Sequence, residues 1–344
     1  MDYSMQKIYS LIVIVVMIGA QLLLSCSHPQ RYSLSQMAMG TIVTVTVDAP
    51  SHEKAHNAIQ AAFDKIKQIE AVMSPYKPDS DVSKINANSK THVSKDTFTV
   101  IEQSMELSHK TNGLFDITFA SIGKLWNIQS PDFIPPSPQT INTYKPCIGY
   151  QLIHLHPENL EVIKEKPCIQ IGLGGIAKGY AIEQAIATLQ NMGIKEAIVE
   201  AGGDLKVIGN NYGYGYTIGI KHPRKEGICG TILLFNGQSI TTSGDYERFA
   251  IYKGKHYHHI LNPKTGYPAK SDIISVSVIA SNATVCDGYA TALFIMGSKQ
   301  AISFLVHNAS LQLQCIIIDT STKIYVSKSL VPCTSFAGYT VVPF

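Results

Sequence analysis

Residues 171–199 contain the feature that most constrains the fold, a run of glycines between two apolar segments. The run reads Ile171-Gly172-Leu173-Gly174-Gly175-Ile176-Ala177-Lys178-Gly179. The pattern predicts a strand ending near Ile171, a helix from about Ile176 to Met192, and a strand over 197–199. A glycine turn before a helix N-terminus can cradle a phosphate or diphosphate with backbone N–H groups. We therefore expect a phosphate-contacting loop with Lys178 in the first helical turn.

Periodicity along the rest of the chain alternates between strand and helix. Strands are predicted at Thr41–Asp48, 216–220, 231–235, 239–241 and 274–280, with a last hairpin near 313–326. Helices are predicted after an N-cap at Ser51, from Asp96 to Asn112-Gly113, over 283–296 and from Ser298. The stretch Pro131–Pro138 predicts a loop or a seam between two lobes. This pattern indicates an α/β (α+β mixed) fold with a mixed sheet rather than a purely parallel one.

The N-terminal segment has the pattern of an export signal. Residues 11–24 form a short apolar run preceded by Lys7, and Leu23-Leu24-Ser25-Cys26 resembles the bacterial lipobox. This predicts a signal peptide over 1–25, lipidation of Cys26, and a tether over 26–36 on a domain outside the cytoplasm. The alternative is an ordinary signal or anchor helix with an incidental cysteine.

Composition excludes some functions. The 344 residues have 28 Lys and Arg against 25 Asp and Glu, a net charge of +3, and show no basic cluster with interleaved aromatics. We therefore expect no nucleic-acid partner. The six cysteines after Cys26 have no zinc-ligand spacing, so their pairing stays open, and buried free thiols are expected for most of them.

Three further constellations could carry chemistry. Asp287 and Thr291 share one helix face, which suits a hard cation such as Mg²⁺ or, alternatively, a plain hydrogen bond. The predicted loop Thr242-Ser243-Gly244-Asp245 could hold phosphate oxygens, and His259 could move a proton. The alternatives are that the loop is only a polar turn and that the histidines are structural. Ala201-Gly202-Gly203-Asp204 is either a functional turn or tight packing. The GxGxxA pattern with Glu200 leaves a dinucleotide-binding Rossmann unit as an alternative.

The motifs occur in the order of one family. They are Met39-Gly40-Thr41, Met73-Ser74-x-Tyr76, Gly113-Leu114-Phe115-Asp116-Ile117-Thr118, Gly172–Gly179, Ala201–Asp204, Thr242–Asp245, His259-Ile260-Leu261-Asn262-Pro263-x-Thr265-Gly266 and Asp287-x-x-x-Thr291. Together they resemble the ApbE family, the FAD:protein FMN transferases, from about residue 33 to 330. The resemblance implies a two-lobed domain over 37–335, with a largely antiparallel mixed sheet and flanking helices. The N-terminal lobe would end at about residue 140.

The family resemblance also implies an activity and a site. The enzyme would face the periplasm of the bacterial cell envelope, cleave FAD with Mg²⁺ and move FMN onto a Thr or Ser of a membrane flavoprotein subunit, with AMP leaving. Mg²⁺ would lie on Asp287, Thr291 and the carbonyl of Gly175, and His259 would take the proton. The FAD-contacting positions would be Met39, Tyr76, Leu114, Phe115, Asp116, Gly172, Lys178, Thr242, Ser243, Gly244 and Leu261.

Three positions differ from the usual family pattern. Gly172 and Asn262 stand where Asp is common, and Glu200 stands where a neutral polar residue is usual. The same groups would serve an FAD pyrophosphatase, with water as the nucleophile, or a non-catalytic flavin-binding lipoprotein. A Rossmann dehydrogenase is the most distant alternative.

Overall fold

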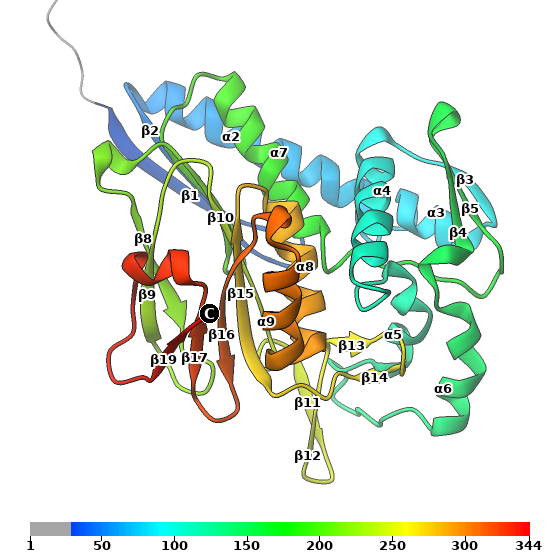
Figure 1. Cartoon of the computed structure of the whole chain (residues 1–344). Helices are drawn as coiled ribbons and strands as arrows, with labels where there is room; N and C mark the ends of the chain where they lie inside the picture. The colour runs from blue at the N-terminus through cyan, green and yellow to red at the C-terminus, as the bar shows by residue number, and fades with distance from the viewer. Residues whose placement is uncertain (1–28) are drawn as a thin grey trace, which may run out of the picture.

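A nine-stranded sheet forms the centre of the fold in the computed structural model, which describes residues 29–344 (Figure 1). The predicted signal peptide and Cys26 lie outside the described residues. Every neighbouring pair in the sheet is antiparallel except the parallel pair β17–β19. The predicted mixed, largely antiparallel sheet is thus confirmed. The strands, in sheet order, are β1 (Gln30–Ala38), β2 (Thr41–Ala49), β6 (Ala197–Ala201), β7 (Asp204–Ile208), β10 (Ser239–Gly244), β15 (Ile273–Ala280), β16 (Gln314–Asp319), β17 (Ile324–Val326) and β19 (Val341–Pro343).

Four helices cover one face of this sheet and bury the largest core (Figure 1). They are α2 (His52–Met73), α7 (Ala177–Asn191), α8 (Ala283–Met296) and α9 (Ser298–His307). Ser51 caps α2, because its side chain accepts a hydrogen bond from the N–H of Lys54 at 3.2 Å. The predicted helices at these positions are confirmed, since caps and a 3.6-residue apolar period are local signals.

A small three-stranded sheet covers the opposite face. It consists of β8 (Tyr216–Lys221), β9 (Ile228–Leu234) and β18 (Thr334–Ser335). Side chains alternate along β15, so Val276 and Val278 enter the helical core while Ile279 enters this second core. The large sheet is therefore buried on both faces in its central strands.

A separate lobe is built from residues 81–164. Its sheet has the order β3 (Lys90–His92), β5 (Glu161–Lys164), β4 (Ile153–His156), and its helices are α3 (Asp81–Ala87), α4 (Lys95–Lys110), α5 (Ala120–Trp126) and α6 (Pro138–Tyr144). The predicted lobe boundary near residue 140 falls inside this unit, because β5 returns to pair with β3. Residues 30–73 belong instead to the large sheet and its helical layer.

Two short ladders connect the lobe to the sheet. They are β11 (Phe249–Tyr252) with β12 (Lys255–His258), and β13 (Leu261–Asn262) with β14 (Tyr267–Pro268). Figure 1 shows the β11–β12 hairpin projecting from the body of the molecule. A third apolar cluster anchors it, in which Phe133 packs on the rings of Tyr252 and Tyr257. The remaining short 3-10 helices are η1 (Ile117–Phe119), η2 (Lys145–Cys147), η3 (Tyr150–Leu152), η4 (Pro157–Asn159), η5 (Asn211–Gly213), η6 (Ala309–Leu311) and η7 (Lys328–Cys333).

Three local predictions are wrong. Residues 30–36 form most of edge strand β1 rather than a tether, because β2 offers them a full antiparallel partner. No strand ends at Ile171: β5 stops at Lys164, and the segment before the glycines has irregular backbone. Residues 242–244 are the end of strand β10, paired with β15, rather than a loop. The fold also reaches beyond residue 335, since β19 belongs to the large sheet.

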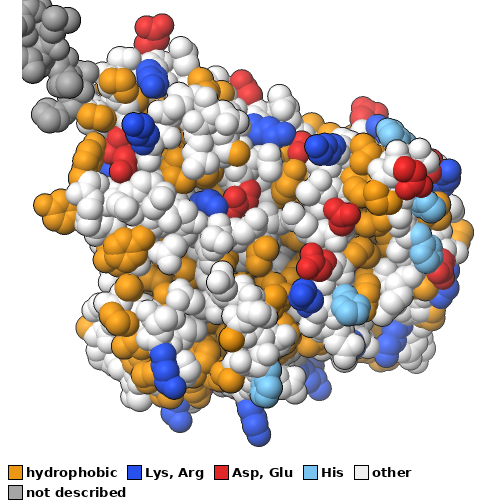
Figure 2. Space-filling view, turned by 45° about the horizontal axis from the view of Figure 1, so that its top comes forward, with side chains coloured by type: hydrophobic (Ala, Val, Ile, Leu, Met, Phe, Trp, Pro, Cys, Tyr) orange, Lys and Arg blue, Asp and Glu red, His pale blue; other side chains and the backbone are white. Residues whose placement is uncertain are grey.

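Figure 2 shows Lys, Arg, Asp and Glu side chains interspersed on the face in view, with no broad patch of one sign. Within residues 29–344, no helix has the length and apolarity needed to cross a membrane.

Candidate active site

Two glycine turns lie side by side at one end of the large sheet. The turn joining β1 to β2 has Met39 and Gly40 at φ of 53° and 72°, and the turn joining β6 to β7 has Gly202 and Gly203 at 60° and 92°. The N–H of Gly202 donates to the carbonyl of Ile42 at 3.1 Å. A Cβ on Gly202 would lie 2.6 Å from Oγ1 of Thr41, so the start of β2 lies against the second turn, after which Asp204 begins β7.

Asp204 joins α7 to β10 through its carboxylate. Its Oδ2 forms an ion pair with Lys178 in the first turn of α7, and its Oδ1 accepts from the N–H of Thr242 at 3.0 Å. Burial raises the pKa of Asp204, while the charge of Lys178 counteracts it. The ion pair therefore holds the glycine loop's helix against the sheet end.

Asp287 lies on α8, directly against the start of α7. Its Oδ2 accepts from the N–H of Gly179 at 3.0 Å. Burial raises the pKa of Asp287 to about 7, although the nearby Lys178 charge opposes the shift. Burial also disfavours the charge on Lys178, but Asp204 and Asp287 outweigh that effect and raise the pKa of Lys178. One cation thus faces two buried carboxyls.

The residues expected to hold Mg²⁺ come together. A Cβ atom on Gly175 would lie 3.1 Å from Oγ1 of Thr291, one helical turn after Asp287. Residues 29–344 contain no cluster of three or more His, Cys, Asp or Glu side chains that could hold a metal. One carboxylate, one hydroxyl and a backbone carbonyl suit a hard cation that leaves positions open for phosphate and water. The donor set therefore fits Mg²⁺ and does not fit zinc.

The second expected flavin segment meets the glycine loop from the smaller lobe. The N–H of Gly172 donates to the carbonyl of Ile117 at 2.9 Å, and a Cβ on Gly172 would lie 3.0 Å from that of Ala120. The ring of Phe115 lies 3.4 Å from the position of a Cβ on Gly175. This close approach gives a physical reason for glycine at 172, where the family commonly has Asp.

Asp116 has a structural task. Its Oδ1 accepts from the N–H and the hydroxyl of Thr118 at 2.8 and 2.6 Å, and its Oδ2 accepts from the N–H of Tyr150 at 2.7 Å. Burial raises its pKa, against these hydrogen bonds. The carboxylate therefore fixes the turn at Thr118 and the backbone at Tyr150, and Oδ2, which accepts one hydrogen bond, has a second lone pair for another donor.

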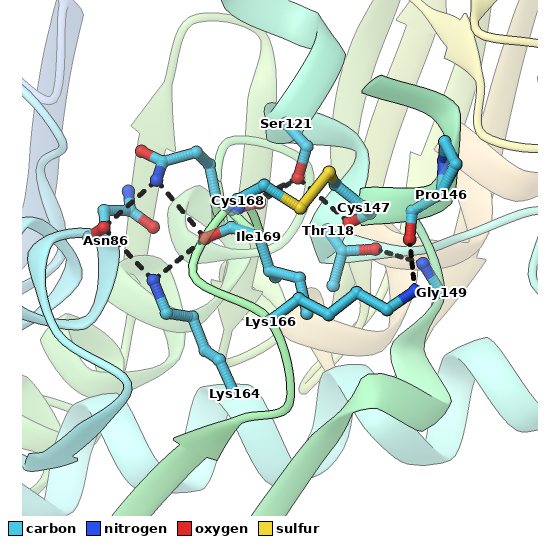
Figure 3. The surroundings of a disulfide bond; sticks show 11 residues. Asn86, Thr118, Ser121, Pro146, Cys147, Gly149, Lys164, Lys166, Cys168 and Ile169 are labelled. Atoms are coloured by element: carbon cyan, nitrogen blue, oxygen red, sulfur yellow. Dashed lines mark hydrogen bonds between the residues drawn. A yellow bond between two sulfur atoms is a disulfide. The ribbon is translucent and has the colours of Figure 1, made fainter. Parts of the chain in front are cut away.

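Side-chain hydrogen bonds hold the segment Ile169–Ile171, which leads into the glycine loop, and Figure 3 shows the one from Lys164 to Ile169. Asn86, in α3, pairs with Ile171 twice: its Oδ1 accepts from the N–H at 2.7 Å and its Nδ2 donates to the carbonyl at 3.0 Å. The buried Nζ of Lys164 donates to the carbonyl of Ile169 at 2.9 Å. These bonds replace the ladder that a strand would have supplied.

A disulfide fixes the start of the same segment (Figure 3). Cys147 and Cys168 are bonded, with their Cα atoms 5.7 Å apart. Next to the bond, Ser121 accepts from the N–H of Gln170 at 2.9 Å and donates to the carbonyl of Cys147 at 3.1 Å. The expectation of buried free thiols holds for the other cysteines that the structure buries, which are Cys229, Cys286 and Cys315.

The two neighbouring histidines have different environments. His258 is buried and uses both ring nitrogens, Nε2 on the carbonyl of Ala269 at 3.0 Å and Nδ1 on the N–H of Ile260. His259 places Nδ1 3.1 Å from the carbonyl of Arg248, so in the neutral ring Nδ1 carries the proton and Nε2 carries the lone pair. His259 is therefore the candidate base.

Charge links His259 to the carboxyl cluster. Burial, together with the smaller effect of the Arg248 charge, lowers the pKa of His259 to about 4 despite the hydrogen bond to the Arg248 carbonyl. The same Arg248 charge lowers the pKa of Lys178. Arg248 is thus within electrostatic reach of both groups, and His259 is neutral at pH 7.

The other residues predicted to contact FAD lie in different surroundings. Thr242 bonds Ser277 through its hydroxyl at 2.7 Å, and a Cβ on Gly244 would lie 2.5 Å from the ring of Tyr246. Leu261, two residues after the candidate base, is buried in the third apolar cluster. Tyr76 is 91% exposed, so its ring is available to a ligand but touches none of the groups above. Leu114 packs against the main core and Ser243 lies on β10.

The sequence analysis did not select Asp204, Arg248 or Asn86 as site residues. Asp204 had a signal, an acid directly after two glycines at a strand end. Arg248 and Asn86 had none, because their roles depend on contacts with residues 11 and 85 positions away.

Comparison with known proteins gives one consistent result. The family model described as "ApbE family" matches residues 39–317. An FAD:protein FMN transferase of Haemophilus influenzae is 30% identical over 88% of this chain and 91% of its own, and one of Treponema pallidum is 28% identical over 80% and 82%. A crystal structure of the ApbE protein of Thermotoga maritima has a TM-score of 0.81 at 32% identity, covering 88% of this chain and 99% of its own. The flavin transferase ApbE of Vibrio cholerae has 0.79 at 27% identity, covering 89% and 99%.

The relatives named as transferases match most of the chain, and the two solved structures superpose on most of it. The Rossmann alternative fails on the fold itself, since no parallel strand pair flanks the glycine loop. From the matched residues and the shared architecture together, we conclude that this chain is an enzyme of the ApbE family.

Proposed function

We propose that this enzyme transfers FMN from FAD to a Thr or Ser hydroxyl of a target protein and releases AMP. The observation that carries the proposal is the buried cluster of Lys178, Asp204 and Asp287 beside the glycine loop and within electrostatic reach of Arg248 next to His259. Such a cluster combines a diphosphate-binding cation, an oxygen ligand for a hard metal and a neutral imidazole.

In the proposed reaction the acceptor oxygen attacks the phosphorus on the riboflavin side of the diphosphate. A new P–O bond forms to the acceptor, the P–O bond to AMP breaks, and Nε2 of His259 takes the hydroxyl proton. Lys178 and the N–H groups of the glycine loop would hold the phosphate oxygens. Mg²⁺ on Asp287, Thr291 and the Gly175 carbonyl would supply charge neutralisation on the diphosphate.

The main alternative is hydrolysis, in which water replaces the acceptor and FMN and AMP are released. The exposed Arg248 and the open surface around it favour transfer, because a protein substrate has to reach His259 from solvent. A purely flavin-binding role would give no use to a neutral imidazole with a free Nε2.

The test uses residues 27–344 with FAD, MgCl₂ and a flavin-acceptor subunit from the same genome. We expect a mass increase on the acceptor equal to FMN and in-gel flavin fluorescence. Both should be absent with Asp287→Ala or His259→Gln. Both should be present with the control His307→Gln, which replaces an exposed residue at the end of α9. Free FMN and AMP with an unmodified acceptor would establish hydrolysis, and bound intact FAD would leave only a binding protein.

We also propose that the chain is anchored by a lipid on Cys26 in the bacterial cell envelope, facing the periplasm, where its acceptors would be flavoprotein subunits of membrane redox complexes. The support is the lipobox-like sequence and a disulfide, which is typical of oxidising compartments. Detergent phase partition of the full chain tests it: the wild type should enter the detergent phase and Cys26→Ser the aqueous phase. Equal partition would refute lipid anchoring.

A further inference from the structure

A groove runs along the β11–β12 hairpin beside the candidate base. It has a volume of about 510 Å³ and lies between residues 128–131 with Phe133 on one side and residues 247–251 on the other. Its lining includes three residues of β11 and none of β12. The groove therefore follows the side of β11 that faces away from its partner.

This side of β11 is an open sheet edge. Within the part of the chain that the structure describes, β11 pairs only with β12. The strands are joined by a two-residue turn, Lys253-Gly254, with positive φ at both positions, which makes Tyr252 and Lys255 a hydrogen-bonded pair. The alternation of antiparallel pairs then directs the N–H and C=O of Phe249 and Ile251 away from β12.

One backbone hydrogen bond supports this register. Continuing the alternation from Tyr252 and Lys255 makes Arg248 and His259 a hydrogen-bonded pair, and the N–H of His259 does donate to the carbonyl of Arg248 at 3.0 Å. The open edge of β11 and the backbone of the candidate base therefore belong to one continuous ladder.

Side chains on the hairpin are suited to a protein partner. Phe249 and Ile251 are 46% and 67% exposed, while the alternate residues Ala250 and Tyr252 pack against the third apolar cluster. Basic side chains predominate on the hairpin, at Arg248, Lys253 and Lys255, and Glu247 at the end of the groove is paired with Lys221 at 3.0 Å. An exposed strand edge with apolar side chains and an excess of positive charge suits the binding of an acidic, extended peptide by β-augmentation.

We propose that the acceptor protein docks here, adding an acidic, extended segment as a third strand along the open edge of β11. This inference rests on the proposed FMN transfer and names how its protein substrate is recognised. Four residues of strand span about 13 Å, so a short segment bound along β11 can present its Thr or Ser at Arg248 and His259.

The test distinguishes the contribution of the β11 backbone to acceptor binding from that of its side chains. Ile251→Pro and Ile251→Ala both lose the exposed side chain, but only the proline variant loses the outward N–H, at a position where proline removes no bond to β12. Transfer kinetics are measured with the acceptor subunit that becomes flavinylated in the source bacterium, produced without covalent flavin. We expect the KM for acceptor to be about five- to tenfold higher for the proline than for the alanine variant, with kcat nearly unchanged.

Charge is tested in parallel. Lys253→Glu with Lys255→Glu should raise the KM for acceptor, and the increase should shrink at high salt. Ile228→Ala, at an exposed apolar position on β9, is the matched control and should keep wild-type kinetics. FAD binding and the melting temperature of each variant report whether the site and fold are intact.

The outcomes are distinct. Equal KM values for Ile251→Pro and Ile251→Ala, with FAD bound normally, would overturn docking at β11 while FMN transfer stands. A wild-type dimer that Ile251→Pro makes monomeric would also overturn it, by assigning the edge to a second copy of this chain. A wild-type enzyme that binds FAD but modifies no acceptor would overturn the proposed function and the docking site together.

Discussion

Buried charge determines the behaviour of single residues in this site. Asp287 is nearly inaccessible to solvent and has a raised pKa, whereas the adjacent Lys178 keeps its charge because two carboxyls surround it. A protein that pays for such groups in folding energy is expected to use them with a ligand. The site residues should therefore show opposite effects on stability and on activity.

Asp287→Asn tests this opposition. The unfolded carboxyl ionises near 3.8 and the folded one near 7, so the free-energy cost of the buried charge is absent below pH 3.8 and complete above pH 7. The neutral variant should have a Tm roughly 5 °C above the wild type at pH 8 in EDTA, with little difference at pH 4.5. Calorimetry at both pH values checks it, and equal Tm values at pH 8 would contradict it. The variant should transfer no FMN.

His259 should titrate far below an ordinary histidine. Its folded pKa is about 4 against 6.5 for the free group, so the unfolded chain binds a proton more readily, and stability falls as the pH drops from 6.5 towards 4. An NMR titration should show the His259 Cε1–H signal, assigned through His259→Gln, unchanged down to about pH 5. A midpoint between 6 and 7 would rule out the desolvated, neutral ring described above.

At the scale of the elements, the sequence predicts most helices and strands but misses the segment before the glycine loop. Helix 283–296 and the helix capped by Ser51 are encoded locally, by period and cap. The path of Ile169–Ile171 is set by side-chain hydrogen bonds from Lys164, five positions before Ile169, and from Asn86, 85 positions before Ile171. The sequence does not show which backbone groups these side chains bond, so the apolar run alone predicts a strand. Residues 242–244 likewise become strand only because β15 lies beside them.

Asn86→Ala should loosen that segment. The change removes both bonds to Ile171 and leaves buried backbone groups unpaired, at a cost of about 1–3 kcal/mol. We expect FAD affinity, measured by quenching of flavin fluorescence, to fall about tenfold as the glycine loop loses its support. Asn88→Ala, at the exposed C-cap of the same helix, is the control and should bind FAD normally. Wild-type affinity in Asn86→Ala would show that the loop holds its own shape.

At the scale of the whole molecule, family membership was predicted from the order of eight motifs, whereas the lobe boundaries were not. The chain leaves the large sheet and its helical layer after α2, builds the smaller lobe and returns, so residues 161–163 pair with residues 90–92 and residues 153–156 pair with residues 161–164. Motif order says nothing about such a return. The sheet's outermost strands, β1 and β19, lie outside the motif-bearing stretch and gave no signal.

The disulfide should stabilise the whole enzyme. Cys147 and Cys168 are 21 positions apart, and closing a loop of this size contributes roughly 3 kcal/mol by restricting the unfolded chain. Cys147→Ser with Cys168→Ser, or dithiothreitol on the wild type, should lower the free energy of unfolding by about 2–4 kcal/mol in urea titrations. Cys333→Ser should change nothing. This contribution would be disproved if dithiothreitol left the free energy of unfolding of the wild type unchanged while mass spectrometry showed that the two thiols were reduced.

The contact between α7 and α8 has a consequence for how this gene can vary. A Cβ on Gly179 would lie 2.2 Å from the carbonyl oxygen of Ala283, and the same residue's N–H orients Asp287. Glycine-to-alanine is the smallest change that a codon for this position permits, yet it would force the two helices apart and turn away the carboxylate. A library of all residues at position 179, selected for covalent flavin on the acceptor, should therefore return glycine alone, so that the mildest substitution in the site acts as a null allele.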